Sequence, residues 1–267
     1  MGPTRTVLCV LGLVSLAGCA TPGAVLPATT AEVRQGPAYG YRPLDPLYVK
    51  LDHPDGVPVS NCRILELLPD ETVRLAVGKV DASGQVSYGL AKVGQKDERY
   101  VIVLDYIKSD TRSMMAKGVQ GTTVGEKYVP TYVGIGLRLS ANLVVKQGTV
   151  DLGNLIAIGA AAQANQVSGT LVIQTLGISG ESIAAAIPIP SEISAASIQN
   201  VLVAIGTIKS KIYDAKTAIS PRVVGIYNVF GDDTPAFDAF FTSLLSSPPG
   251  LDIRLNSVQC PPPGVDK

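Results

Sequence analysis

The stretch YVGIGLRLSANLVV, residues 132–145, decides the fold more than any other part of the chain. Apolar side chains occupy its odd-numbered positions, namely Val133, Ile135, Leu137, Leu139, Ala141, Leu143 and Val145. Small or polar residues occupy even-numbered positions between them, namely Gly134, Gly136, Arg138, Ser140 and Asn142. Because successive side chains of a strand point to opposite faces, the alternation predicts one long, half-buried strand. A sheet with one solvated face is typical of antiparallel pairing.

The segments after this strand alternate between predicted helices and strands. Residues 151–165 favour a helix of small residues, and residues 167–178 are apolar on both faces, as in a central strand. A longer helix follows, for which Ser191 or Ser194 is a candidate N-cap. Its apolar residues recur at helical spacing, namely Ile198, Leu202, Ile205, Ile208 and Ile212. Residues 223–230 predict one more strand.

A last helix is predicted to have Thr234 as its N-cap and Pro235 at the first helical position. Its apolar residues have the spacing i, i+3, i+4, i+7 and i+8, namely Phe237, Phe240, Phe241, Leu244 and Leu245. All four Phe of the chain lie between Phe230 and Phe241. We expect this segment to lock the core of the second half; the alternative is an exposed stripe that binds a partner.

The region before residue 132 predicts strands and one long loop. Residues 71–80, 85–90 and 99–107 have the composition of strands, and they suggest a small antiparallel module over residues 47–107. Residues 108–130 contain three Gly and no clear period, so we expect a Gly-rich loop. The side chains expected to bind a partner there are Arg112, Met114, Met115 and Lys117, since Met makes adaptable contacts. The alternative is a mobile connector.

Together these segments predict an α+β fold. A small antiparallel β module (47–107) is followed by the Gly-rich loop (108–130) and a mixed α+β domain (131–250), in which two or three helices pack on a sheet. Residues 251–267 form a C-terminal tail. The order of strands and helices also suits a parallel βαβ sheet, but the strict alternation over residues 132–145 favours α+β.

The start of the chain has the pattern of a signal peptide. Arg5 precedes an apolar run of about 11 residues, which is too short to span a bilayer. The tetrad Leu16-Ala17-Gly18-Cys19 that follows resembles the lipobox of bacterial lipoproteins. The resemblance implies a signal peptide over residues 1–18, cleavage before Cys19, a thioether-linked diacylglycerol on its sulfur and fatty acyl chains such as palmitate. An ordinary secretory signal with a chance cysteine is the alternative.

The resemblance also implies a location. Ala20 follows the cysteine, and by the sorting habit of that class a residue other than Asp there favours the outer membrane of a Gram-negative cell, with the periplasmic side preferred. Two or more acyl chains hold a protein firmly on a membrane. Residues 19–46 are rich in Pro, Gly, Ala and Thr, so we expect a flexible tether whose end, residues 39–47, packs on the folded part.

The cysteines fit an oxidising compartment. Of the four Cys, Cys9 lies in the signal segment and Cys19 is the lipidation candidate, which leaves Cys62 and Cys260. This even remainder predicts one disulfide, and the alternative is two unpaired thiols. Closing so long a loop stabilises a fold by about 5 kcal/mol at most in the chain-entropy model.

Catalytic and metal-binding patterns are weak. His53 is the one histidine, in a turn-rich stretch where Asp52 or Asp55 could orient it as a base; a surface turn residue is the simpler interpretation. Neither G-x-S-x-G nor S-x-x-K occurs. The acidic pair Asp232 and Asp233 precedes a predicted helix, which explains it without a metal. We therefore expect no metal and no cofactor.

The chain carries 22 Lys+Arg and 22 Asp+Glu, so no net field favours nucleic acid as a partner. We expect a lipid-anchored envelope protein with a non-enzymatic binding or scaffolding role, whose partner is another envelope protein or a second copy. An envelope hydrolase with a site invisible in the sequence is the alternative. A ring-forming or membrane-inserting protein is a third interpretation, since residues 132–145 could line a barrel.

Overall fold

Two long strands organise the computed structural model. β6 (Arg99–Ala116) and β7 (Lys127–Val145) form one antiparallel hairpin, in register from Arg99 opposite Val144 to Ala116 opposite Lys127. The structure describes residues 40–52, 59–89, 92–117, 126–231 and 233–252. The strand predicted over residues 132–145 lies inside β7 and is confirmed. Its odd-numbered side chains from Val133 to Val145 are each at most 2% exposed.

One antiparallel sheet contains most of the remaining strands. Its order is β1 (Tyr41–Tyr48), β13 (Arg222–Tyr227), β7, β6, β3 (Asp70–Val80) and β4 (Val86–Tyr88). The edge of β7 opposite β6 is shared by two strands. β13 pairs with residues 131–134, and β9 (Val167–Leu176) pairs with residues 136–145. The sheet therefore forks beside Gly134 and Gly136.

Short ladders complete the pairing. β11 (Ser191–Glu192) extends the main sheet beside β9. β2 (Lys50–Asp52) pairs in parallel with β14 (Gly250–Asp252), and β5 (Val93–Gln95) pairs with β8 (Thr149–Asp151). β10 (Ile178–Ser179) pairs with β12 (Ala218–Ile219).

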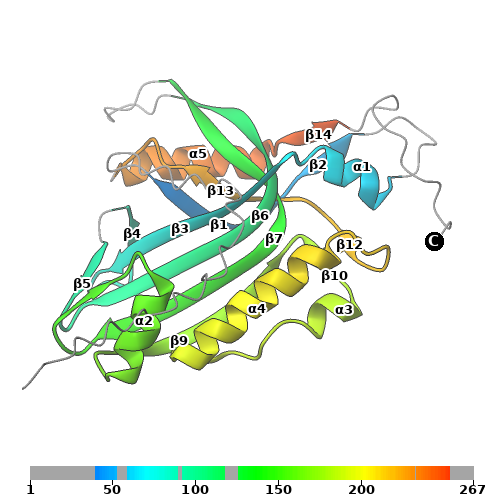
Figure 1. The fold of residues 1–267 in the computed structure, drawn as a ribbon. Coiled ribbons are helices and arrows are strands. Elements are labelled where there is room, and N and C mark those ends of the chain that lie inside the picture. The colour runs from blue at the N-terminus through cyan, green and yellow to red at the C-terminus, as the bar shows by residue number, and fades with distance from the viewer. Residues whose placement is uncertain (1–39, 53–58, 90–91, 118–125, 232, 253–267) are drawn as a thin grey trace, which may run out of the picture. The chain divides into compact units, whose positions relative to one another are not determined.

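The predicted α+β class, a small β module followed by helices packed on a sheet, is wrong. Of the described residues, 47% lie in strands and 25% in helices, and the strands form a nearly closed, barrel-like antiparallel sheet in which β1 approaches β3. The strands assigned to two modules share this one sheet, because β3 pairs with β6 and β6 pairs with β7 along its whole length. Figure 1 shows the three strands running together across the molecule.

The predicted boundaries shift for the same reason. Much of the segment predicted as a Gly-rich loop over residues 108–130 is strand, since β6 continues to Ala116 and β7 begins at Lys127. Residues 108–116 have no apolar alternation, so their strand conformation depends on backbone pairing with β7. β1 begins at Tyr41, inside the segment predicted as a tether over residues 19–46.

Five helices lie in the described part of the chain: α1 (Asn61–Glu66), α2 (Leu155–Gln163), α3 (Glu181–Ala184), α4 (Ala195–Lys211) and α5 (Thr234–Ser246). Ser194 is the N-cap of α4, and its hydroxyl accepts a hydrogen bond from the Ser197 backbone N–H at 3.0 Å. The predicted N-cap of α5, Thr234, is wrong by one residue, since Asp233 is the N-cap and Thr234 is already helical. Each cap satisfies a donor that the first helical turn leaves unpaired.

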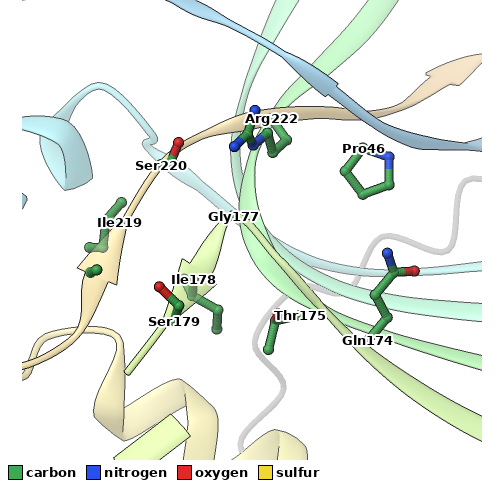
Figure 2. A pocket seen from close by; sticks show the side chains of 10 residues that line it. Pro46, Gln174, Thr175, Gly177, Ile178, Ser179, Ile219, Ser220 and Arg222 are labelled. Carbon is green, nitrogen blue, oxygen red and sulfur yellow. The ribbon is translucent and has the colours of Figure 1, made fainter. Parts of the chain in front are cut away.

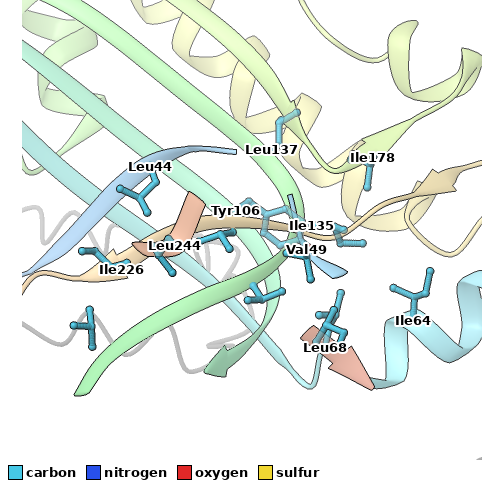
Figure 3. Packing of buried hydrophobic residues seen from close by; sticks show 14 of the residues in the cluster. Leu44, Val49, Ile64, Leu68, Tyr106, Ile135, Leu137, Ile178, Ile226 and Leu244 are labelled. Atoms are coloured by element: carbon cyan, nitrogen blue, oxygen red, sulfur yellow. The ribbon is translucent and has the colours of Figure 1, made fainter. Parts of the chain in front are cut away.

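The helices cover the odd-numbered face of β7. α2 and α4 lie side by side (Figure 1) and pack in one cluster with Leu139, Leu143 and Val145. α5 and α1 contribute to a second cluster around Val133, Ile135 and Leu137, part of which Figure 3 shows. A third, smaller cluster lies on the even-numbered face, inside the curled sheet; its buried members are Tyr41, Ala76, Val103, Ile107, Tyr132, Leu176 and Val224.

The prediction that the phenylalanines belong to the core is confirmed. Phe230, Phe237 and Phe240 are at most 8% exposed, and the ring centroids of Phe230 and Phe240 lie 5.4 Å apart. Leu245, at the end of the same apolar spacing, is 57% exposed. α5 therefore turns its aromatic side chains toward the sheet.

Truncation of one of these rings should destabilise the fold strongly. We expect Phe240→Ala to lower the free energy of unfolding by about 3–5 kcal/mol, because it leaves a cavity where a buried ring packed. Leu245→Ala on the same helix is the matched control and should change it by less than about 1 kcal/mol. Urea denaturation measures both values; equal effects would show that α5 does not pack as described.

Candidate functional site

Charged side chains form a row across the even-numbered face of the sheet. Arg74 on β3 lies opposite Asp105 on β6, and Asp105 lies opposite Arg138 on β7. Asp105 is 0% exposed and Arg138 is 5% exposed. The alternation in the sequence placed Arg138 on a solvated face, and this expectation is wrong, because the curled sheet brings β1 over that face.

Arg138 and Asp105 form a bidentate ion pair. Arg138 Nε donates to Asp105 Oδ1 at 2.8 Å, and Arg138 Nη2 donates to Asp105 Oδ2 at 2.6 Å. The guanidinium also donates to two backbone carbonyls, from Nη1 to Leu44 O at 2.6 Å and from Nη2 to Val224 O at 2.7 Å. A buried pair offsets the cost of leaving water only with such additional hydrogen bonds.

Both carbonyls come from irregular strands. The pairing of β13 with β7 shifts between Val223 and Gly225, so Val224 lies outside the regular ladder. The pairing of β1 with β13 shifts between Pro43 and Leu47, which takes Leu44 out of its ladder. Bulges of this kind leave a residue unpaired and re-aim it. Here they turn two carbonyls toward Arg138.

Tyr41 completes the buried network. Its hydroxyl donates to Asp105 Oδ2, and its ring lies against Gly225, where an added Cβ would clash with the ring. Burial, together with the Asp105 carboxylate, raises the pKa of the Tyr41 phenol well above its ordinary value of 10.0. Position 225 therefore requires glycine, because the Tyr41 ring packs where any larger side chain would begin.

Arg138 stays charged in this network. Burial lowers the pKa of its guanidinium, but the hydrogen bond and the charge of Asp105 outweigh burial and raise it. Arg74 lies across Asp105 from Arg138 on the neighbouring strand β3. Its guanidinium carbon is 3.8 Å from the centre of the Tyr132 ring. Because the acid, the phenol and the cation already hold one another, we infer that this network stabilises the fold.

The four residues predicted to bind a partner lie at the end of the β6–β7 hairpin, but they do not share one face. Arg112 is half-buried, with Nε 2.5 Å from Asp110 Oδ2, and Met114 packs against the core. Met115 is 47% exposed, and Lys117 is also exposed. The structure therefore brings Met115 and Lys117 to the surface and turns Met114 inward.

Sequence reasoning missed Tyr128. It lies directly opposite Met115 on β7 and is 66% exposed. The two side chains form an exposed cross-strand pair, which we call the hairpin-end pair. Ala116 and Val129, on the opposite face of the same strands, are at most 2% exposed. Tyr128 lies inside the segment predicted as a Gly-rich loop over residues 108–130, so its aromatic side chain next to Lys127 was the one local signal that could have found it.

Several predicted sites fall outside the described residues, namely Cys19, His53, Asp55, Asp232 and Cys260. Cys62 is half-buried on α1, and its pairing with Cys260 stays a prediction. Within the described ranges, no three His, Cys, Asp or Glu side chains gather as metal ligands would. Asp233, one of the acidic pair, accepts a hydrogen bond from the Ala236 backbone N–H at 3.1 Å.

No family model, curated protein or solved structure matches this chain. Among the helices of the described segments, none has both the length and the apolar character needed to cross a bilayer.

Removal of one member of the buried ion pair should lower the free energy of unfolding far more than removal of both. We expect Asp105→Asn to lower the free energy of unfolding by about 3–5 kcal/mol, because it leaves Arg138 buried without its counter-charge. The double variant Asp105→Leu with Arg138→Met should cost less than the single variant. Urea denaturation of the three proteins tests this order; a nearly neutral Asp105→Asn would contradict the described network.

The raised phenol pKa predicts instability at alkaline pH. The folded chain holds the Tyr41 proton more tightly than the unfolded chain, so the stabilisation is complete below pH about 10 and is lost as the pH rises above it. One such phenol contributes a slope of up to about 1.4 kcal/mol per pH unit. Tyr41→Phe should therefore flatten the decline between pH 10 and 12, and Tyr213→Phe, an exposed control, should not. An unchanged slope in Tyr41→Phe would refute this assignment.

Proposed function

We propose that this chain is a lipid-anchored protein of the bacterial envelope that acts by binding another envelope protein. The lipobox residues Leu16, Ala17, Gly18 and Cys19 support the anchor. The hairpin-end pair, Met115 with Tyr128, is the observation that carries the binding role. Outer-membrane sorting remains part of the proposal through Ala20, which follows the lipidated cysteine.

Rigid backbone supports a binding role for the hairpin end. The ladder between β6 and β7 reaches Met115 and Tyr128 without a break in register, and Val129 beside them is 0% exposed. A backbone that is already held on ordered strands does not have to be ordered when a partner covers it, which lowers the entropic cost of binding. Tyr is also among the residues enriched at the energetic centres of protein interfaces.

Charged side chains of this chain form a polar rim around the hairpin-end pair. Lys117, Glu126 and Lys127 are exposed next to the hairpin-end pair, while Arg112 and Asp110 form an ion pair further along β6. An apolar centre surrounded by charged residues is the usual anatomy of a protein interface. We therefore infer a protein partner.

The anchor is tested by changing its acceptor. Cys19→Ser should abolish incorporation of labelled palmitate in a Gram-negative host and move the protein from the membrane fraction to the soluble fraction, because a thioether cannot form on serine. Cys62→Ser is the matched cysteine control and should still incorporate label. Labelling of Cys19→Ser at the level of the unaltered chain would overturn the anchor.

The binding surface is tested by photocrosslinking from defined positions. A benzoylphenylalanine at position 115 or 128 should capture one defined envelope protein in cells. The same probe at Ile156, which is 72% exposed on α2, is the control for an exposed apolar site and should not capture it. Equal capture from all three positions, capture of further copies of this chain alone, or no capture would overturn a heterologous partner at the hairpin end.

A partner held by this pair should also be lost on its removal. Met115→Ser with Tyr128→Ser should weaken capture from a third probe, placed at Ser113, by at least tenfold, since each exposed apolar anchor contributes to the interface centre. Ile156→Ser is the control. Unweakened capture would show that the hairpin-end pair does not carry the contact.

A further inference from the structure

A depression lies where the sheet forks. The pairing of β13 with β7 ends at Gly134, and the pairing of β9 with β7 begins at Gly136. The β10–β12 ladder and a hydrogen bond from Ser220 N to Gly177 O, 2.8 Å long, close the far side of the fork. The open depression left between the strands has a volume of about 540 Å³, within the range of small-molecule sites.

Among the described residues that line this depression, Arg222 is the one that carries a charge. Its backbone is fixed, since it pairs with Tyr48 on one side and with Gly134 on the other. Its side chain is half-buried, and within the described part of the chain no hydrogen bond or ion pair holds its guanidinium. Arg138 and Arg112, by contrast, each lie against a carboxylate.

Polar and apolar groups line the same depression as this guanidinium. Ser179, Ser220 and Gln174 line the same depression and provide hydroxyl and amide hydrogen-bond groups, and Figure 2 shows them with Arg222. Pro46 and Ile219 line it with half-buried apolar surface. The lining thus combines one cation, neutral donors and an apolar wall.

We propose that this depression binds a small organic carboxylate. The planar fork of Arg222 suits bidentate contact with a carboxylate, and the serine hydroxyls can donate to the same oxygens. One cation balances one negative charge, which favours a monoanion over phosphate. Pro46 and Ile219 would cover the apolar body of the ligand. This site uses none of the residues of the hairpin-end pair, so the proposed ligand and the proposed partner are tested independently.

Hexanoate is the probe that tests the site. In an NMR titration of the mature chain, sodium hexanoate should shift the backbone amides of Gly177, Ser179 and Ser220 saturably. Hexan-1-ol at equal concentration and sodium phosphate at equal ionic strength should not. Absence of saturable hexanoate shifts would overturn the proposal, and so would equal binding of the alcohol or tighter binding of phosphate.

Variants assign the binding to Arg222. Arg222→Met should weaken hexanoate binding at least tenfold, because the charge-assisted hydrogen bonds are lost. Arg222→Lys, which keeps the charge and loses the fork, should bind with intermediate affinity. Arg99→Met, at an exposed arginine outside the depression, is the control and should bind as the unaltered chain does.

The backbone spectrum of each variant shows whether it is folded. If Arg222→Met does not fold, Arg222→Lys and the pair Ser179→Ala with Ser220→Ala provide the test, and either should weaken binding severalfold. Hexanoate binding that is unchanged in every folded variant would overturn the site.

Discussion

The buried pair of Asp105 and Arg138 is the constraint on which the rest of the structure depends. Two charges on adjacent central strands, 0% and 5% exposed, are tolerable only if every lone pair and proton around them is used. The fold meets this demand with groups that are far apart in the sequence, since Tyr41, Leu44 and Val224 all reach the pair. The same contacts bring β1 over the interior face. The hydrogen bonds that the ion pair requires and the curling of the sheet therefore arise together.

The irregularities of the strands follow from this demand. In a regular ladder the carbonyls of Leu44 and Val224 would accept hydrogen bonds from neighbouring strands. The register shifts of β1 and β13 instead allow them to accept hydrogen bonds from Arg138. The shift in β13 also lies close to the place where β7 changes partner from β13 to β9. The depression beside Arg222 is therefore a product of the same geometry that closes the interior.

Local patterns in the sequence predicted single elements better than their assembly. The alternation in β7, the capped helix α4 and the aromatic face of α5 were all predictable, since each depends on residues close together in the chain. The extension of β6 from Lys108 to Ala116 was not, because its side chains have no strand pattern and its pairing with β7 supplies the stability. Arg138 looked solvated for the same reason: the cover over it comes from β1, almost a hundred positions earlier.

The candidate sites also divide into features that the local sequence predicts and features that depend on the assembled fold. Met115 could be found as a methionine in a polar stretch, but its partnership with Tyr128 exists only through the register of the hairpin. Nothing near Arg222 in the sequence distinguishes it from other arginines, because its surroundings come from β1, β9, β10 and β12. Separation along the chain, more than residue type, sets the limit of prediction here.

The pairing of β1 with β13 has a consequence for the order in which the chain can fold. The Tyr41 hydroxyl reaches the Val224 carbonyl across 183 positions, so the first described strand has no place to dock until nearly all of the chain is present. Contacts this distant along a chain slow folding, because loop closure comes before any stabilising contact. A chain emerging from its amino end would hold Asp105 and Arg138 without their final shield until the last third arrived. Its native topology would then be assembled only once β13 is present, late in the emergence of the chain.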